Sequence, residues 1–334
     1  MDHVRILKQA WQITWRYRAL WVFGVILALT TARSGTGGPQ FNSLGEDISS
    51  PSGEFWIPEI SSEMVGALIA VIVGLLCLML ILMVVASIAR YVAETALIRM
   101  VNDHAETGEQ QRVRQGFRLG WSRAAWRLFL IDMLVNVPAI LVLILLFAIA
   151  FAPLLLWTTD SRAAGALGTA VTIGLLILAI LLAIVLGTVL SLLRCFFRRA
   201  CALEELVVIE SIRYGFNVIR RRLKDVAIMW LIMVGVGLGV GIAMIVVILL
   251  LMVAGALGGG LPALLVAGMT SQAMEGVTPW VLAAAVGIPI FLLVVGVPTL
   301  FLGGLIEVFK SSVWTLVYRE LHTPEGMQAE PGVS

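Results

Sequence analysis

Five long stretches that are nearly free of charged residues constrain this chain more than any other feature of its sequence. Crossing a bilayer takes about 20 consecutive apolar residues, because hydrocarbon offers no hydrogen-bond partner to exposed backbone groups. All five stretches exceed that length, and Asp132 and Glu307 are the only charged residues within them. The stretches are residues 64–89, 128–157, 165–193, 226–256 and 280–309. The sequence therefore predicts an all-α, polytopic membrane protein.

The overall composition agrees with a lipid environment. Of the 334 residues, 60% are hydrophobic and only 13% are charged, whereas soluble domains contain about 25% charged residues. The net charge of +2 is too small to indicate a nucleic-acid partner. The three histidines and three cysteines are not spaced as metal ligands. We therefore expect no nucleic acid, metal or other cofactor.

A shorter segment, residues 19–31, has two interpretations. Its 13 uncharged residues suit the apolar region of a cleaved signal peptide, with a small-residue cleavage site at Thr30-Thr31-Ala32. The preceding segment, residues 1–18, is rich in Trp and Arg and instead suits an interfacial helix beside a retained span. We favour the retained span, which brings the total to six transmembrane helices.

The distribution of basic residues predicts the orientation. With six spans, 21 of the 23 Lys and Arg residues fall on one side, and only Arg33 and Arg162 fall on the other. The basic side consists of residues 1–18, 90–127, 194–225 and 310–334. Because Lys and Arg are retained in the cytoplasm, both termini are predicted to be cytoplasmic. The opposite side includes an acidic outer loop, residues 32–63, and an apolar segment, residues 261–269, expected at the outer interface.

A repeated unit precedes three of the spans. At an offset of 95 residues, Gly120-Trp121 matches Gly215-Phe216, and flanking apolar residues recur at three- and four-residue steps. A weaker N-terminal copy aligns Ala10-Trp11 with the same pairs. Each copy predicts a basic, aromatic amphipathic helix at the cytoplasmic interface. The expected architecture is thus three transmembrane hairpins, each preceded by one such helix.

The Gly120-Trp121 and Gly215-Phe216 pairs, each followed by basic residues and a span, also support a family resemblance. The chain resembles poorly characterised bacterial membrane proteins that are similar to the membrane domain of glycerophosphoryl diester phosphodiesterase. This resemblance implies a six-helix bundle in the bacterial cytoplasmic membrane, without a settled activity. The enzymatic relatives carry a separate soluble barrel with histidines and carboxylates. These 334 residues contain no such barrel, so no catalytic residue is carried over.

Polar residues within the spans are candidate sites, because charge in hydrocarbon is unfavourable. Asp132 and Asn136 form an i, i+4 pair on one helix face, followed by Pro138, which frees a backbone carbonyl. Alternatively, Asp132 lies only about 6 Å from the interface and pairs with nearby arginines. Glu307 has Lys310 one turn later, so a structural ion pair is expected there.

Two further groups have both a functional and a structural interpretation. The densest basic run either contacts anionic lipid head groups or only enforces the topology. It consists of Arg220, Arg221, Arg222 and Lys224. Alternate glycines in the fifth span lack the Lys, Ser or Thr that a nucleotide loop needs, so they predict close helix packing. They are Gly235, Gly237, Gly239 and Gly241.

Three functions are compatible with this pattern. The leading hypothesis is a non-enzymatic membrane protein that acts as a scaffold, an assembly factor or a modulator of the lipid environment. Membrane lipids and another membrane protein are its expected partners. The alternative is a transporter or permease for a small apolar or amphiphilic solute, with Asp132 and Asn136 as its polar contact. A lipid-modifying membrane enzyme is the third, for which Glu204, Glu205 and Glu210 form the only dense acidic group.

Overall fold

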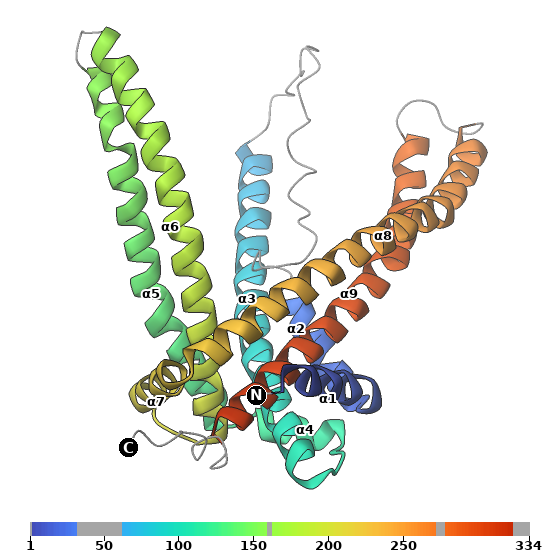
Figure 1. The fold of residues 1–334 in the computed structure, drawn as a ribbon. Helices are drawn as coiled ribbons and strands as arrows, with labels where there is room; N and C mark the ends of the chain where they lie inside the picture. The colour runs from blue at the N-terminus through green and yellow to red at the C-terminus, as the bar shows by residue number, and fades with distance from the viewer. Residues whose placement is uncertain (1, 32–61, 159–161, 272–277, 323–334) are drawn as a thin grey trace, which may run out of the picture.

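The structure, a computed structural model, describes residues 2–31, 62–158, 162–271 and 278–322 (Figure 1). Within these ranges the regular secondary structure is entirely helical. In chain order the helices are α1 (His3–Arg16), α2 (Ala19–Thr31), α3 (Ser62–Thr107), α4 (Val113–Gly120), α5 (Arg123–Phe151), the 3₁₀ helix η3 (Ala152–Thr158), α6 (Arg162–Leu203), α7 (Val208–Arg221), α8 (Leu223–Thr270) and α9 (Thr278–His322).

Five of these helices, α3, α5, α6, α8 and α9, are long and apolar enough to cross a membrane. Their most apolar windows are between 0% and 11% buried within the protein. Such extensive exposed apolar surface is stable only against lipid, since soluble proteins rarely expose apolar patches of this size. The chain is therefore a multi-pass membrane protein. The sixth apolar helix, α2, spans about 20 Å, which is less than the hydrocarbon core of about 30 Å.

The long helices converge at one end and diverge toward the other. α5 packs along α6, α8 packs along α9, and α2 lies between α3 and α9 (Figure 1). The main core forms where the helices meet, from side chains of α2, α3, α6, α8 and α9 together with those of α1. Its fully buried members include Tyr17, Phe23, Leu97, Met100, Phe196, Met229 and Tyr318.

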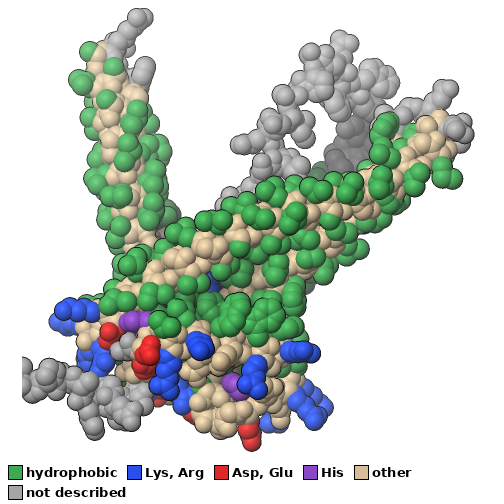
Figure 2. All heavy atoms as spheres, turned by 45° about the vertical axis from the view of Figure 1, so that its right-hand side comes forward, with side chains coloured by type: hydrophobic (Ala, Val, Ile, Leu, Met, Phe, Trp, Pro, Cys, Tyr) green, Lys and Arg blue, Asp and Glu red, His purple; other side chains and the backbone are tan. Residues whose placement is uncertain are grey.

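The charged residues gather at this convergent end (Figure 2). We call it the basic end, and it comprises residues 2–18, 90–127, 194–225 and 310–322. It contains α1, α4 and α7 as well as the adjoining ends of the long helices. Every described Lys and Arg side chain lies in these four segments. The partition of charge seen in the sequence therefore corresponds to one physical end of the molecule.

The predicted spans are parts of longer helices. α3 continues from the apolar stretch to Thr107, and α6 continues to Leu203. A change from apolar to amphipathic residues does not interrupt backbone hydrogen bonding, so these helices end only where the chain turns. Gly108, with φ of 73°, and Glu205, with φ of 53°, adopt the left-handed conformation typical of helix ends.

The segment expected at the outer interface is also part of a long helix. Residues 261–269 continue α8, which runs through Pro262 to Thr270. The reason is close packing against α9, because a Cβ atom on Gly259 would lie only 2.6 Å from the carbonyl oxygen of Gly287. This packing extends the α8–α9 pair beyond the predicted end of the fifth span.

Candidate functional site

A buried ion-pair cluster joins α3, α5 and α6 at the basic end. The Arg198 guanidinium donates to both carboxylate oxygens of Asp132, from Nε at 3.0 Å and from Nη2 at 2.5 Å. Its Nη1 donates to Glu94 Oε1 at 2.6 Å. The Tyr91 hydroxyl donates to Asp132 Oδ2 at 3.0 Å. Asp132, only 4% exposed, thus lies against an arginine, as the structural interpretation of this residue expects.

The neighbouring pair, Arg194 and Asn136, consists of a cation and a neutral amide. Arg194 donates from Nη1 to Asn136 Oδ1 at 2.6 Å and from Nε to the Leu190 carbonyl at 3.3 Å. Both acceptors are neutral. No described carboxylate forms an ion pair with Arg194, whereas Arg198 has two carboxylate partners.

Matching helical periodicity creates these contacts. Asp132 and Asn136 are one turn apart on α5, and Arg194 and Arg198 are one turn apart on α6. Because four residues rise about 6 Å along any α-helix, both pairs align across two adjacent helices. Sequence analysis did not identify Arg194, Arg198 or Glu94 as site residues. The matched i, i+4 spacing on consecutive helices was the signal that could have found the two arginines.

The other charged candidates lie at the surface, within the basic end or, for Glu307, just next to it. Glu307 Oε1 accepts from Lys310 Nζ at 3.2 Å, on a partly exposed part of α9. In the basic run 220–224, Arg222 approaches Asp225 at 3.9 Å, while the side chains of Arg220, Arg221 and Lys224 are exposed. This run lies at the junction of α7 and α8, where it could meet lipid head groups.

The glycine faces predicted for close packing have no partner helix in the described part of the chain. Cβ atoms on Gly235, Gly237, Gly239 and Gly241 would meet no atom within 4 Å. Close approach occurs elsewhere, because the structure places other glycines where helices touch. Gly255, Gly259 and Gly287 lie between α8 and α9, and Gly24 and Gly304 lie between α2 and α9.

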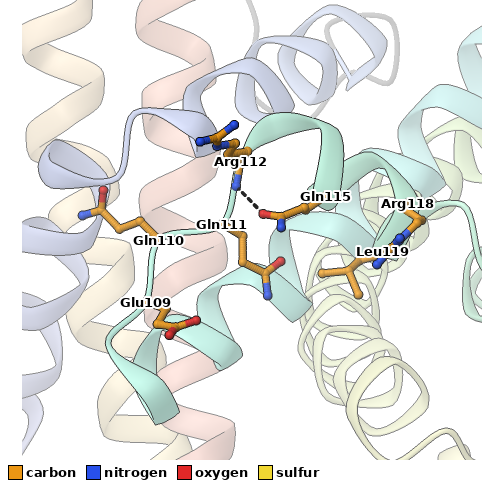
Figure 3. A pocket seen from close by; sticks show the side chains of 7 residues that line it. All are labelled: Glu109, Gln110, Gln111, Arg112, Gln115, Arg118 and Leu119. Atoms are coloured by element: carbon orange, nitrogen blue, oxygen red, sulfur yellow. Dashed lines mark hydrogen bonds between the residues drawn. The ribbon is translucent and has the colours of Figure 1, made fainter.

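Two surface hollows of the basic end do not adjoin the ion-pair cluster. One, of about 370 Å³, lies beside α4 and is lined mainly by polar side chains (Figure 3). Within it, the Arg112 backbone amide donates to Gln115 Oε1 at 2.9 Å and thereby caps α4 (Figure 3). A second, of about 180 Å³, lies between α3 and the end of α6. Neither is lined by Asp132 or Asn136.

The three repeat helices share one packing arrangement. The small residue of each pair is buried, and the aromatic residue that follows it is exposed. A Cβ atom on Gly120 would overlap the carbonyl oxygen of Val92 in α3, and one on Gly215 would lie 2.8 Å from the Phe197 ring in α6. The buried residues are Ala10, Gly120 and Gly215, and the exposed aromatics are Trp11, Trp121 and Phe216, at 56%, 73% and 50% exposure. The repeat therefore encodes a helix that lies close to the bundle and carries an exposed aromatic side chain. Among these aromatics, Trp11 also contacts the Phe309 ring of α9 edge-on, with ring centroids 6.1 Å apart.

Two of the three carboxylates considered for an enzyme, Glu204 and Glu205, lie against cationic or titratable partners. Glu204 Oε1 lies 3.4 Å from His322 Nε2, and the Tyr214 hydroxyl is hydrogen-bonded to His322 Nδ1 at 2.6 Å. Burial raises the pKa of the Tyr214 hydroxyl, and the charge of Glu204 raises it further. Glu205 pairs with Arg99 at 2.9 Å, and Glu210 is exposed. The described residues contain no group of three His, Cys, Asp or Glu able to hold a metal ion.

Comparison with known proteins adds one assignment. A family of unknown function, DUF7544, matches residues 3–320. The chain belongs to this family. The DUF7544 match includes all three repeat helices and nearly all of the five long helices. It shows no link to glycerophosphoryl diester phosphodiesterase, so that resemblance remains a hypothesis. No curated protein and no solved structure matches the chain.

Proposed function

We propose that this protein is a non-enzymatic integral membrane protein that modulates the lipid environment at the cytoplasmic leaflet. The observation that carries the proposal is the common arrangement of α1, α4 and α7. In each helix a buried small residue holds the helix against the bundle and an exposed aromatic follows it. Trp side chains favour the membrane–water interface, and nearby arginines attract anionic lipids.

The distribution of exposed side chains on α1 supports this role. Trp11 and Trp15 are exposed, and so are Arg5, Lys8 and Arg16, while the opposite face is buried in the core. A helix with exposed aromatics and cations on its outer face suits the boundary between head groups and acyl chains. Three such helices around one bundle would order or sort the lipids next to it, and a scaffold role for a membrane partner could use the same faces.

The proposed topology has six spans arranged as three hairpins in the bacterial cytoplasmic membrane, with both termini in the cytoplasm. It is supported by the gathering of Lys and Arg at the basic end, since cytoplasmic segments retain basic residues. α2 would serve as the short first span, held against α9 at Gly24 and Gly304.

Thiol labelling tests this topology in a background without Cys77, Cys195 and Cys201. Cysteines introduced at Arg112 and Arg220 should be accessible from the same side of the membrane, and labelling from opposite sides would overturn it.

The contacts of the described residues do not favour the transporter alternative. Its proposed polar contacts, Asp132 and Asn136, are engaged by Arg198 and Arg194, and the hollows at the basic end lie elsewhere. Solute flux through vesicles that contain only the purified protein would favour transport over the proposed function.

Lipid selection can be measured directly with spin-labelled lipids. In reconstituted vesicles, spin-labelled phosphatidylglycerol should be more motionally restricted next to the protein than spin-labelled phosphatidylcholine. Combined replacement of Arg5, Lys8 and Arg16 by glutamine should remove this preference, because these exposed cations of α1 attract the anionic head group. Combined replacement of Trp11, Trp121 and Phe216 by alanine should instead lower the restriction of both lipids.

A control in which exposed Leu141, Leu181 and Leu249 are replaced by alanine should retain both the preference and the restriction, because these residues lie within the long apolar helices. Equal restriction of both lipids around the unmodified protein would refute the proposal.

A further inference from the structure

We propose that Arg194, with Asn136, binds the phosphate of one acidic phospholipid between α5 and α6 at the inner edge of the hydrocarbon. The inference rests on the membrane placement in the proposed function, but it concerns a site separate from the exposed faces of α1, α4 and α7. It identifies an individual lipid-binding site rather than a general preference for acidic lipid.

The first argument is charge balance. Arg198 receives both nearby carboxylates, because Asp132 and Glu94 each bond to it. Arg194, one turn closer to the apolar stretch, has only an amide oxygen and a backbone carbonyl as acceptors. No carboxylate among the described residues pairs with it. The charge of Asp132 also acts on Arg194, but both Asp132 oxygens are bonded to Arg198. An arginine at this level with no carboxylate in direct contact is unfavourable in hydrocarbon, so a mobile anion is its expected partner.

The second argument is position. The uncharged stretch of α6 ends at Leu193, so the Arg194 guanidinium lies where acyl chains give way to head groups. One turn toward the apolar stretch on the same helix faces, Leu190 on α6 is partly exposed and Ile140 on α5 is about half exposed. These apolar side chains provide a surface along which the acyl chains of a lipid can lie while its phosphate remains at Arg194.

The third argument is donor chemistry. A guanidinium presents several N–H groups in one plane and binds phosphate oxygens in pairs. The Asn136 amide oxygen accepts from Arg194, which leaves its Nδ2 as a donor that bonds to no described residue. Phosphatidylglycerol and phosphatidylcholine both offer a phosphate to these donors, but the Arg194 cation would repel the ammonium group of the zwitterionic lipid. The favoured ligand is therefore a lipid with a net negative head group, such as phosphatidylglycerol.

Two variants test the assignment with purified, detergent-solubilised full-length protein. Arg194→Gln removes the cation. Asn136→Asp keeps the cation and the side-chain size but supplies an internal carboxylate that competes with the lipid phosphate. Arg99→Gln is the matched control, because it removes an arginine that pairs with Glu205 and that is not assigned to lipid. Binding of short-chain phosphatidylglycerol is measured by native mass spectrometry, with phosphatidylcholine and inorganic phosphate as comparison probes.

The unmodified protein and Arg99→Gln should hold one phosphatidylglycerol in preference to phosphatidylcholine. Both Arg194→Gln and Asn136→Asp should weaken this binding about tenfold, as expected for loss of one charge-assisted contact. Unchanged binding in Asn136→Asp would overturn the proposal even if Arg194→Gln fails to fold. Displacement of the lipid by equimolar inorganic phosphate would overturn the assignment to a lipid.

Failure of this inference is distinguishable from failure of the proposed function. Restriction of spin-labelled lipid depends on the exposed aromatics of the three repeat helices and should persist in Arg194→Gln. Loss of the single bound lipid with intact restriction supports both statements. Intact single-lipid binding in both variants would overturn only the Arg194 site.

Discussion

Arg198 of α6 binds both carboxylate oxygens of Asp132 on α5, at 3.0 Å and 2.5 Å. The same guanidinium bonds to Glu94 on α3, so one side chain connects three helices. Above this level α3 diverges from the α5–α6 pair (Figure 1). The cluster therefore lies where it can hold these helices together at the basic end.

Arg198→Ala should lower the stability of the protein strongly. It would leave the buried Asp132 and the partly buried Glu94 without the guanidinium that pairs with both, and loss of one partner of a buried ion pair costs about 3–5 kcal/mol in other proteins. Asp132→Asn should have a smaller effect, because Glu94 still pairs with Arg198. Thermal unfolding in detergent measures both. Arg220→Ala, at an exposed position, should stay within about 0.5 kcal/mol of the unmodified protein. Equal unfolding temperatures for the Arg198 and Arg220 variants would contradict a stabilising role for the cluster.

Tyr17→Phe should loosen the chain segment that joins α3 to α4, which Tyr17 holds through the Gln111 backbone. The Tyr17 hydroxyl accepts from the Gln111 backbone amide at 2.6 Å and donates to the Gln111 carbonyl at 3.0 Å. Removing it leaves two partly buried backbone groups unpaired, at a cost of about 1–3 kcal/mol. Hydrogen exchange should accelerate at Gln111. Tyr214→Phe, which removes a hydroxyl bonded to His322, should leave exchange at Gln111 unchanged.

The same tyrosine predicts a response to alkaline pH. Burial raises the pKa of Tyr17 above its ordinary value of 10.0, the charge of Asp103 raises it further, and the Gln111 backbone hydrogen bond opposes them. Because the folded state favours the neutral phenol, its contribution to stability is complete below pH 10.0 and is lost as the pH rises through the raised pKa. Unfolding measured against pH should show this loss in the unmodified protein. A Tyr17→Phe variant with the same alkaline decline would rule Tyr17 out as its source.

Gly120→Ala should separate α4 from α3, whereas Gly239→Ala should be tolerated. A methyl group at Gly120 would overlap the backbone of Val92, which cannot move as a flexible side chain can. We expect a loss of about 1–3 kcal/mol. At Gly239 the added methyl meets no atom within 4 Å, and alanine favours the helix by up to about 1 kcal/mol. Comparison of the two unfolding temperatures checks the prediction. A marked loss at Gly239 would instead reveal a partner helix outside the described chain.

Sequence reasoning identified the elements better than the contacts between them. It predicted helix throughout and the five long apolar helices, because apolar length is read directly along the chain. It also identified the repeat at Gly120 and Gly215, whose small side chains the structure explains by close packing. The packing expected at Gly235 to Gly241 was assigned from a local pattern that occurs in many membrane helices, and the described chain instead uses Gly255, Gly259 and Gly287.

The sequence by itself determined that the long helices of this protein lie in lipid, that its fold is all helical, and which segments carry its cations. Each of these follows from hydrophobicity and charge summed over neighbouring residues. Only the tertiary structure decided which charges meet. Arg198 is 66 residues from Asp132 and 104 from Glu94, and Arg194 is 58 from Asn136. Contacts across such separations depend on how helices rotate and pack. Only the three-dimensional structure therefore shows that Arg198 pairs with carboxylates, whereas Arg194 bonds to neutral oxygen atoms.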